Sequence, residues 1–133
     1  MQVKLCSLMV NDQDKALKFY TEILGFIKKT EIPMGEYRWL TVTSIEGPND
    51  LELVLEPTGF PPSKTYQSAL FAAGIPLTAL ATRDIRAEYL RLKDLGVVFR
   101  GEPQVAGPVM IVLFEDTCGN LINLYQVLEN GHE

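Results

Sequence analysis

Histidine is almost missing from this sequence, and its scarcity limits the chemistry that the side chains could do. The only histidine among the 133 residues is His132, one position before the C-terminal residue. A non-haem iron site of the facial-triad type needs two imidazoles and a carboxylate, and many catalytic nucleophiles need an imidazole beside them. His132 stands in a polar terminal run, where side chains are usually solvated. We therefore expect neither kind of site.

The two cysteines, Cys6 and Cys118, do not form a recognisable pattern either. Their number and spacing fit neither a secreted disulfide scaffold nor a zinc ribbon. Asp116 lies two residues before Cys118 and would disfavour a thiolate there. We predict two reduced thiols with structural roles, in a cytoplasmic protein.

Glu52 is the strongest candidate for a catalytic or ligand-binding residue. Its carboxylate interrupts an apolar run, between Leu51 on one side and Leu53 and Val54 on the other. Three interpretations stay open: a general base, an anchor for a ligand, or one residue of a solvated strand face. A carboxylate that faces a pocket would favour the first two.

The overall composition indicates one soluble globular domain. The sequence has a hydrophobic fraction of 47% and a net charge of −5, from 12 basic and 17 acidic residues. This balance argues against a nucleic-acid binder, which needs a basic surface. No stretch approaches the ~20 apolar residues that cross a membrane, and the N-terminus lacks the pattern of a signal peptide. We expect no membrane partner.

The apolar periodicity predicts the same order of elements twice, which makes this an α+β protein built from two β-α-β-β-β modules. The first predicted helix is capped by Asn11 or Asp12 and ended by Gly25, and the second is capped by Asp84 and ended by Gly96. The predicted helical stretches cover residues 16–24 and 85–95, and the predicted strands cover 3–10, 26–32, 37–44, 51–56, 77–82, 97–100, 109–115 and 121–126. Within a single domain of residues 1–133, we place module 1 at about 1–56, a connecting segment at 57–75, module 2 at about 76–127 and a polar tail at 128–133.

Several short motifs, in this order, resemble the vicinal oxygen chelate superfamily, which contains glyoxalases, bleomycin-resistance proteins and ring-cleaving dioxygenases. The resemblance extends from about residue 3 to residue 127. The motifs are Val10-Asn11-Asp12 followed by Ala16-Leu17-Lys18-Phe19-Tyr20, then Leu24-Gly25-Phe26, Leu51-Glu52-Leu53, residues 90–96, and Asp116-Thr117-Cys118-Gly119-Asn120-Leu121-Ile122.

The resemblance implies a half-open barrel in which two modules enclose a central cavity. It also implies four metal-ligand positions, which fall on Leu5, Glu52, Leu77 and Asn123. Three of these four are not ligand residues. The sequence therefore argues against a catalytic transition metal, and we predict no metal site and no cofactor, although a divalent metal that is held in an unusual way stays possible.

Strand alternation selects the residues that would face such a cavity. Side chains alternate between the two faces of a strand, so one set packs on the helices and the other set points away from them. The predicted ligand-binding residues are Leu5, Ser7, Met9, Tyr37, Trp39, Thr41, Glu52, Glu56, Leu77, Asn123 and Tyr125.

Two functions follow from these expectations. The first is a metal-free protein that binds and sequesters a small molecule, which would be cationic or aromatic. The second is a lyase, isomerase or dioxygenase that acts on a small substrate, with Glu52 as a base or with an atypical metal site. A vestigial cavity in a structural or regulatory dimer is a third interpretation. In each case we predict a homodimer, because half-open modules leave sheet edges that a second copy can cover.

Overall fold

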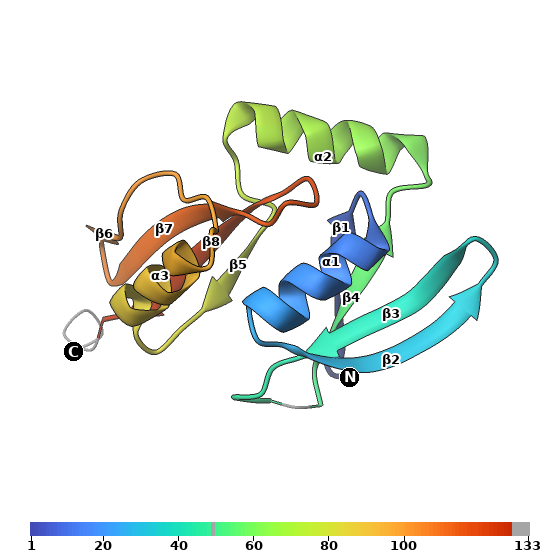
Figure 1. Cartoon of the computed structure of the whole chain (residues 1–133), viewed down its shortest axis with the longest axis horizontal. Coiled ribbons are helices and arrows are strands. Elements are labelled where there is room, and N and C mark those ends of the chain that lie inside the picture. The colour runs from blue at the N-terminus through green and yellow to red at the C-terminus, as the bar shows by residue number, and fades with distance from the viewer. Residues whose placement is uncertain (49, 129–133) are drawn as a thin grey trace. The chain divides into compact units, whose positions relative to one another are not determined.

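The structure is a computed structural model and describes residues 1–48 and 50–128 (Figure 1). The chain divides into two compact units. The first contains residues 1–69 and 117–119, and the second contains residues 70–116 and the chain from Asn120 onward. Most of the predicted polar tail, with His132, lies outside the described residues.

The first unit contains a four-stranded sheet in the order β1-β4-β3-β2. β1 and β4 are parallel, and the other neighbouring pairs are antiparallel. The elements are β1 (Leu5–Val10), α1 (Gln13–Lys18), a π-helical turn η1 (Phe19–Ile23), β2 (Ile27–Met34), β3 (Tyr37–Thr43) and β4 (Glu52–Pro57). This is the predicted β-α-β-β-β order.

Helix α1 begins at its predicted cap and packs on β3 and β4 (Figure 1). The Asp12 side chain accepts a hydrogen bond from the backbone N–H of Lys15, which satisfies one of the donors left unpaired at a helix start. Gly25 has a φ of +93°, so a residue without a Cβ ends the helical segment, as predicted. The core of this unit is the apolar face between helix and sheet: Leu8, Val10, Ala16, Phe19, Tyr20, Leu40, Val42 and Leu55 are buried.

The second unit repeats the arrangement with the sheet order β5-β8-β7-β6. Asp84 caps its helix by accepting from the backbone N–H of Ala87, and Ile85, Tyr89 and Leu92 form the buried face of that helix. The elements are β5 (Thr78–Ala81), α3 (Ile85–Asp94), β6 (Gln104–Ala106), β7 (Val109–Glu115) and β8 (Leu121–Val127). The predicted α+β fold with two β-α-β-β-β modules is confirmed.

One predicted strand is wrong. Residues 97–100 form no strand, and Phe99 makes an isolated bridge with Phe114. The Phe99 ring packs edge-on against Tyr89, with ring centroids 4.7 Å apart, and Gly101 then turns the chain at a φ of +114°. The strand that pairs with β7 is instead β6, at residues 104–106. Packing in an aromatic cluster, rather than pairing in a β-sheet, explains the apolar pattern of residues 97–100.

The predicted connecting segment, residues 57–75, contains a helix. Helix α2 (Pro61–Ala73) contains 13 residues and begins at a proline, a residue that suits the first turn because its missing N–H is not needed there. None of the helices in the described part of the chain is long and apolar enough to cross a membrane.

Candidate functional site

One face of the first sheet carries all the site residues that were predicted in module 1. α1 covers the opposite face, so the residues that alternate with the buried core point away from the helix. The strand register places Leu5 opposite Glu52, Met9 opposite Glu56, and Thr30 opposite Thr41. We call this surface the Glu52 face; it consists of Leu5, Ser7, Met9, Ile27, Thr30, Ile32, Met34, Tyr37, Trp39, Thr41, Thr43, Glu52, Val54 and Glu56.

Glu52 is held in place by two hydroxyl groups. Thr41 Oγ1 donates to Glu52 Oε1 at 2.7 Å, and Thr30 Oγ1 donates to the same oxygen at 3.3 Å. Thr41 is fully buried and Glu52 is half-buried. Within the described residues, no hydrogen bond to Oε2 and no ion pair to Glu52 is seen. The carboxylate is therefore oriented by neutral donors, and no cation among the described residues pairs with it.

Glu56, the other carboxylate of this face, is held more loosely. Its contact with the Ser7 hydroxyl measures 3.5 Å, which is too long for a strong hydrogen bond. Glu52 and Glu56 were both predicted as ligand-binding residues. Both lie on the Glu52 face, but the two short contacts orient Glu52.

The Glu52 face also exposes large apolar side chains. Leu5 is 47% exposed, Ile32 is 52% exposed and Met34 is 61% exposed. Trp39 is half-buried, directly opposite Ile32 in the register. A charged group that lies beside exposed apolar and aromatic surface is typical of a small-molecule site.

This face also contains four residues of β2 that were not predicted as site residues: Ile27, Thr30, Ile32 and Met34. β2 has a register shift between Lys28 and Thr30, where one extra residue is inserted, so simple alternation from Ile27 does not place Thr30, Ile32 and Met34 on this face. A strict alternation starting at Ile27 would have placed Thr30 on the opposite face. With the bulge, the side chain of Thr30 reaches Glu52.

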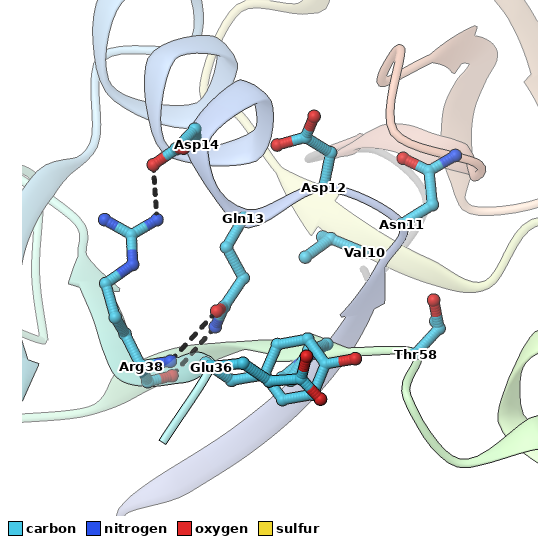
Figure 2. A pocket seen from close by; sticks show the side chains of 10 residues that line it. Val10, Asn11, Asp12, Gln13, Asp14, Glu36, Arg38 and Thr58 are labelled. Atoms are coloured by element: carbon cyan, nitrogen blue, oxygen red, sulfur yellow. Dashed lines mark hydrogen bonds and ion pairs between the residues drawn. The ribbon is translucent and has the colours of Figure 1, made fainter. Parts of the chain in front are cut away.

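A separate pocket of about 490 Å³ lies beside α1 of the first unit (Figure 2). The side-chain amide of Gln13 donates to the backbone carbonyls of Arg38 and Leu55, and its oxygen accepts from the Arg38 N–H. Figure 2 shows Asp14 facing the Arg38 guanidinium, with which it forms an ion pair of 2.6 Å. The lining residues are Val10, Asn11, Asp12, Gln13, Asp14, Glu36, Tyr37, Arg38, Pro57 and Thr58.

Tyr37 is the only residue of this pocket that was predicted as a site residue. Asp12 is the helix cap, Gln13 holds the Arg38 peptide, and Asp14 pairs with Arg38. Several of the pocket's polar groups are therefore already engaged in holding the chain, and the Glu52 face is the better candidate for ligand binding.

In the second unit, the predicted residues Asn123 and Tyr125 lie on the sheet face opposite α3. Ile122 and Leu124, which alternate with them, are buried on the α3 side of the sheet. Asn123 pairs with Ala79 and Leu113, and Tyr125 pairs with Ala81 and Ile111. We call this surface the Asn123 face; it consists of Ala79, Ala81, Ile111, Leu113, Asn123 and Tyr125.

Leu77 is half-buried just before β5, and its N–H donates to the carbonyl of Leu121. Glu52 lies in the first unit, whereas Leu77, Asn123 and Tyr125 lie in the second. That one cavity combines these residues stays a prediction.

The donor chemistry of the four family positions does not fit a metal centre. Leu5 and Leu77 have no donor atom in their side chains, and Asn123 offers a neutral amide. In residues 1–48 and 50–128, no group of three or more His, Cys, Asp or Glu side chains could hold an ion.

Cys118 is buried in the turn before β8, and its carbonyl accepts from Asn11 N–H and from Gln67 Nε2.

Comparison with known proteins agrees with this fold. The model of the Glyoxalase/Bleomycin resistance protein/Dioxygenase superfamily matches residues 2–124. The chain is 49% identical over 126 residues to YurT of Bacillus subtilis (strain 168), covering 95% of this chain and 99% of that protein. It is 31% identical to a probable lactoylglutathione lyase of Synechocystis sp. (strain ATCC 27184 / PCC 6803 / Kazusa), covering 90% of each chain.

A solved structure is similar over nearly the same length. TnmS3, an antibiotic binding protein from Streptomyces sp. CB03234, is 33% identical, with a TM-score of 0.75 and coverage of 96% of both chains. The family match, the sequence relatives and the repeated module agree with one another. The chain belongs to the Glyoxalase/Bleomycin resistance protein/Dioxygenase superfamily.

Proposed function

We propose that this protein is a metal-free member of the superfamily that binds and sequesters a small molecule, with Glu52 as the anchor of the ligand. The observation that carries the proposal is the arrangement of Glu52 itself. Two threonine hydroxyls orient its carboxylate, and no cation among the described residues neutralises it. A half-buried carboxylate without a cationic partner favours a ligand that supplies one.

The surroundings of Glu52 define the rest of the ligand. The face exposes Leu5, Ile32 and Met34 and carries the half-buried Trp39. Apolar side chains favour an apolar ligand body, and a Trp ring attracts a cation that lies over it. We infer a cationic aromatic or amphipathic ligand, for which a charged contact and an aromatic contact together contribute about 2–4 kcal/mol.

Two further observations support the proposal. Two of the four family ligand positions are leucines, so the family's ligand set cannot be completed by this chain. TnmS3, which is similar over 96% of this chain, is an antibiotic binding protein.

A thermal-shift screen of cationic aromatic compounds tests the proposal. We expect hits that stabilise the wild type and that lose most of their effect with Glu52→Gln and with Trp39→Ala. Glu52→Gln keeps the shape of the side chain and removes its charge, so the loss reports on charge. Glu102→Gln, at an exposed residue of the second unit, is the matched control and should leave the shifts unchanged. Hits that are equally strong in all four proteins would contradict the assignment.

The second candidate is an enzyme of the lyase, isomerase or dioxygenase type with Glu52 as a base. The observation that favours it is the second carboxylate oxygen, Oε2, to which no bond is seen among the described residues. The relative that is a probable lactoylglutathione lyase suggests the first substrate to test. Turnover of lactoylglutathione by the wild type, with or without added divalent metal, and its loss in Glu52→Gln would favour this candidate over sequestration.

A further inference from the structure

Asn123 has a side-chain oxygen that is buried and, within residues 1–48 and 50–128, lacks a hydrogen-bond partner. It lies in the middle of β8, with Ala79 opposite it on one side and Leu113 on the other. Its neighbours along the strand, Ile122 and Leu124, are buried on the α3 side. Side chains alternate along a strand, so the Asn123 amide points away from α3.

The oxygen of this amide is buried but has no donor. Asn123 Oδ1 is inaccessible to solvent, and no group in the described part of the chain donates a hydrogen bond to it. Most buried polar atoms in proteins have a partner, and a buried acceptor without one reduces stability by about as much as a lost hydrogen bond. Such an atom points to a donor that the chain itself does not supply.

The immediate surroundings of this oxygen are mostly apolar. Ala79 is small and exposed, and Leu113 is half-exposed beside Asn123. Ile111 and Tyr125 form the next cross-strand pair on the same face, and both are half-exposed. A hydrogen bond that forms in apolar surroundings is stronger than the same bond in water. The face therefore combines one acceptor with surface for an apolar ring or chain.

We propose that Asn123 is a specificity-determining residue, whose side-chain oxygen accepts a hydrogen bond from a hydroxyl or N–H group of an otherwise apolar ligand. This inference rests on the proposed binding function and adds the chemical class of the group that is recognised. A ligand with that donor completes the bonding of Asn123, whereas an analogue without it leaves the oxygen unpaired. Sites of this kind reject the analogue strongly.

Two probes that differ only in the donor test the inference. 2-Naphthol carries a hydroxyl group on a flat apolar ring system, and 2-methoxynaphthalene has the same ring system with the hydroxyl methylated. Titration of the wild type should show about tenfold tighter binding of 2-naphthol, the effect of one buried hydrogen bond. Asn123→Leu should abolish this preference, so that the two probes bind about equally. Asn123→Asp, which keeps an acceptor oxygen, should retain the preference.

The stability of the variants without a ligand is the second readout. Because the leucine removes an unpaired acceptor, Asn123→Leu should unfold at the same urea concentration as the wild type or at a higher one. Gln104→Leu, which also replaces an amide with leucine, at an exposed residue of β6, is the control for added apolar surface. A clear loss of stability in Asn123→Leu alone would show that the oxygen has a partner within the protein, which would overturn the inference.

The binding outcomes are equally decisive. Equal affinity of the wild type for the two probes, or binding of neither, would overturn the role of Asn123. The anchor role of Glu52 is tested separately, with cationic compounds and Glu52→Gln, so its failure would be distinguishable from the failure of this inference.

Discussion

The side chain of Gln67 lies directly against Gly119. A Cβ added to Gly119 would be 2.8 Å from the amide carbon of Gln67, closer than Cβ contacts are found in proteins. Gln67 is the buried residue of α2, with 2% of its surface exposed, and its Nε2 donates to the carbonyls of Met9 and Cys118. Gln67 thus joins three segments of the first unit: the part of α2 before Leu70, the end of β1 and residues 117–119.

We predict that Gln67→Leu destabilises the protein by about 2–3 kcal/mol, because both carbonyls lose a buried donor. Gly119→Ala should also destabilise it, since position 119 has a φ of +103° and no room for a methyl group. Urea unfolding measures both effects. Ser68→Ala, at the exposed neighbour of Gln67, is the control and should change the midpoint little. Wild-type stability in Gln67→Leu would show that the two hydrogen bonds are dispensable.

We predict that Glu31 stabilises the protein at neutral pH and that this contribution is lost in acid. Hydrogen bonds from Lys28 and from Arg38 lower the pKa of Glu31 below its ordinary value of 4.5. A carboxyl whose pKa is lower in the folded state stabilises the fold above the ordinary value, and this contribution is lost as the pH falls through the folded pKa. The loss of stability between about pH 6 and about pH 3 should therefore be smaller in Glu31→Gln than in the wild type.

Urea midpoints at the two pH values measure this difference. Glu102→Gln removes an exposed carboxylate from a loop and should keep the acid sensitivity of the wild type. If Glu31→Gln and the wild type lost stability in parallel, the ion pairs of Glu31 with Lys28 and Arg38 would not contribute.

We predict that no first-row transition metal co-purifies stoichiometrically with the protein, because Leu5 and Leu77 cannot coordinate one. Elemental analysis after dialysis is the measurement, and about one zinc, nickel, iron or manganese ion per chain would contradict the prediction. The double variant Leu5→His and Leu77→His should raise the affinity for divalent metal, if these positions correspond to the family's ligand positions. Leu5→Met and Leu77→Met together, which add no imidazole, are the control.

We predict a homodimer in solution. Phe60 and Tyr66, next to and within α2, are 68% and 56% exposed, so they offer apolar surface to a second copy. Sedimentation at micromolar concentration should show a species of twice the chain mass of 14.9 kDa. Phe60→Ser with Tyr66→Ser should shift the protein toward the monomer. A stable monomer of the wild type would contradict the prediction.

The sequence by itself determined the repeated β-α-β-β-β order and the ends of the helices. Asp12 and Asp84 cap α1 and α3 as predicted, and Gly25 and Gly96 take positive φ values where each helical segment ends. These features are local: a cap bonds to a residue three positions along the chain, and a turn needs a glycine at one position. Alternation along a strand is local as well, which is why the faces that carry Glu52 and Asn123 could be assigned from the sequence.

Only the tertiary structure decided which residues act together. The bulge before Thr30 reverses the alternation of β2. As a result, the hydroxyl of Thr30 joins that of Thr41 in donating to the Glu52 carboxylate. The apolar pattern of residues 97–100 belongs to an aromatic cluster around Phe99, while the shorter β6 pairs with β7. Gln67 donates to carbonyls that are distant in sequence, and the Asn123 oxygen is recognised as unpaired only when the surrounding side chains are placed. Periodicity shows which side of a strand a residue occupies, but a hydrogen-bond partner across the sheet depends on register and packing, which no local pattern specifies.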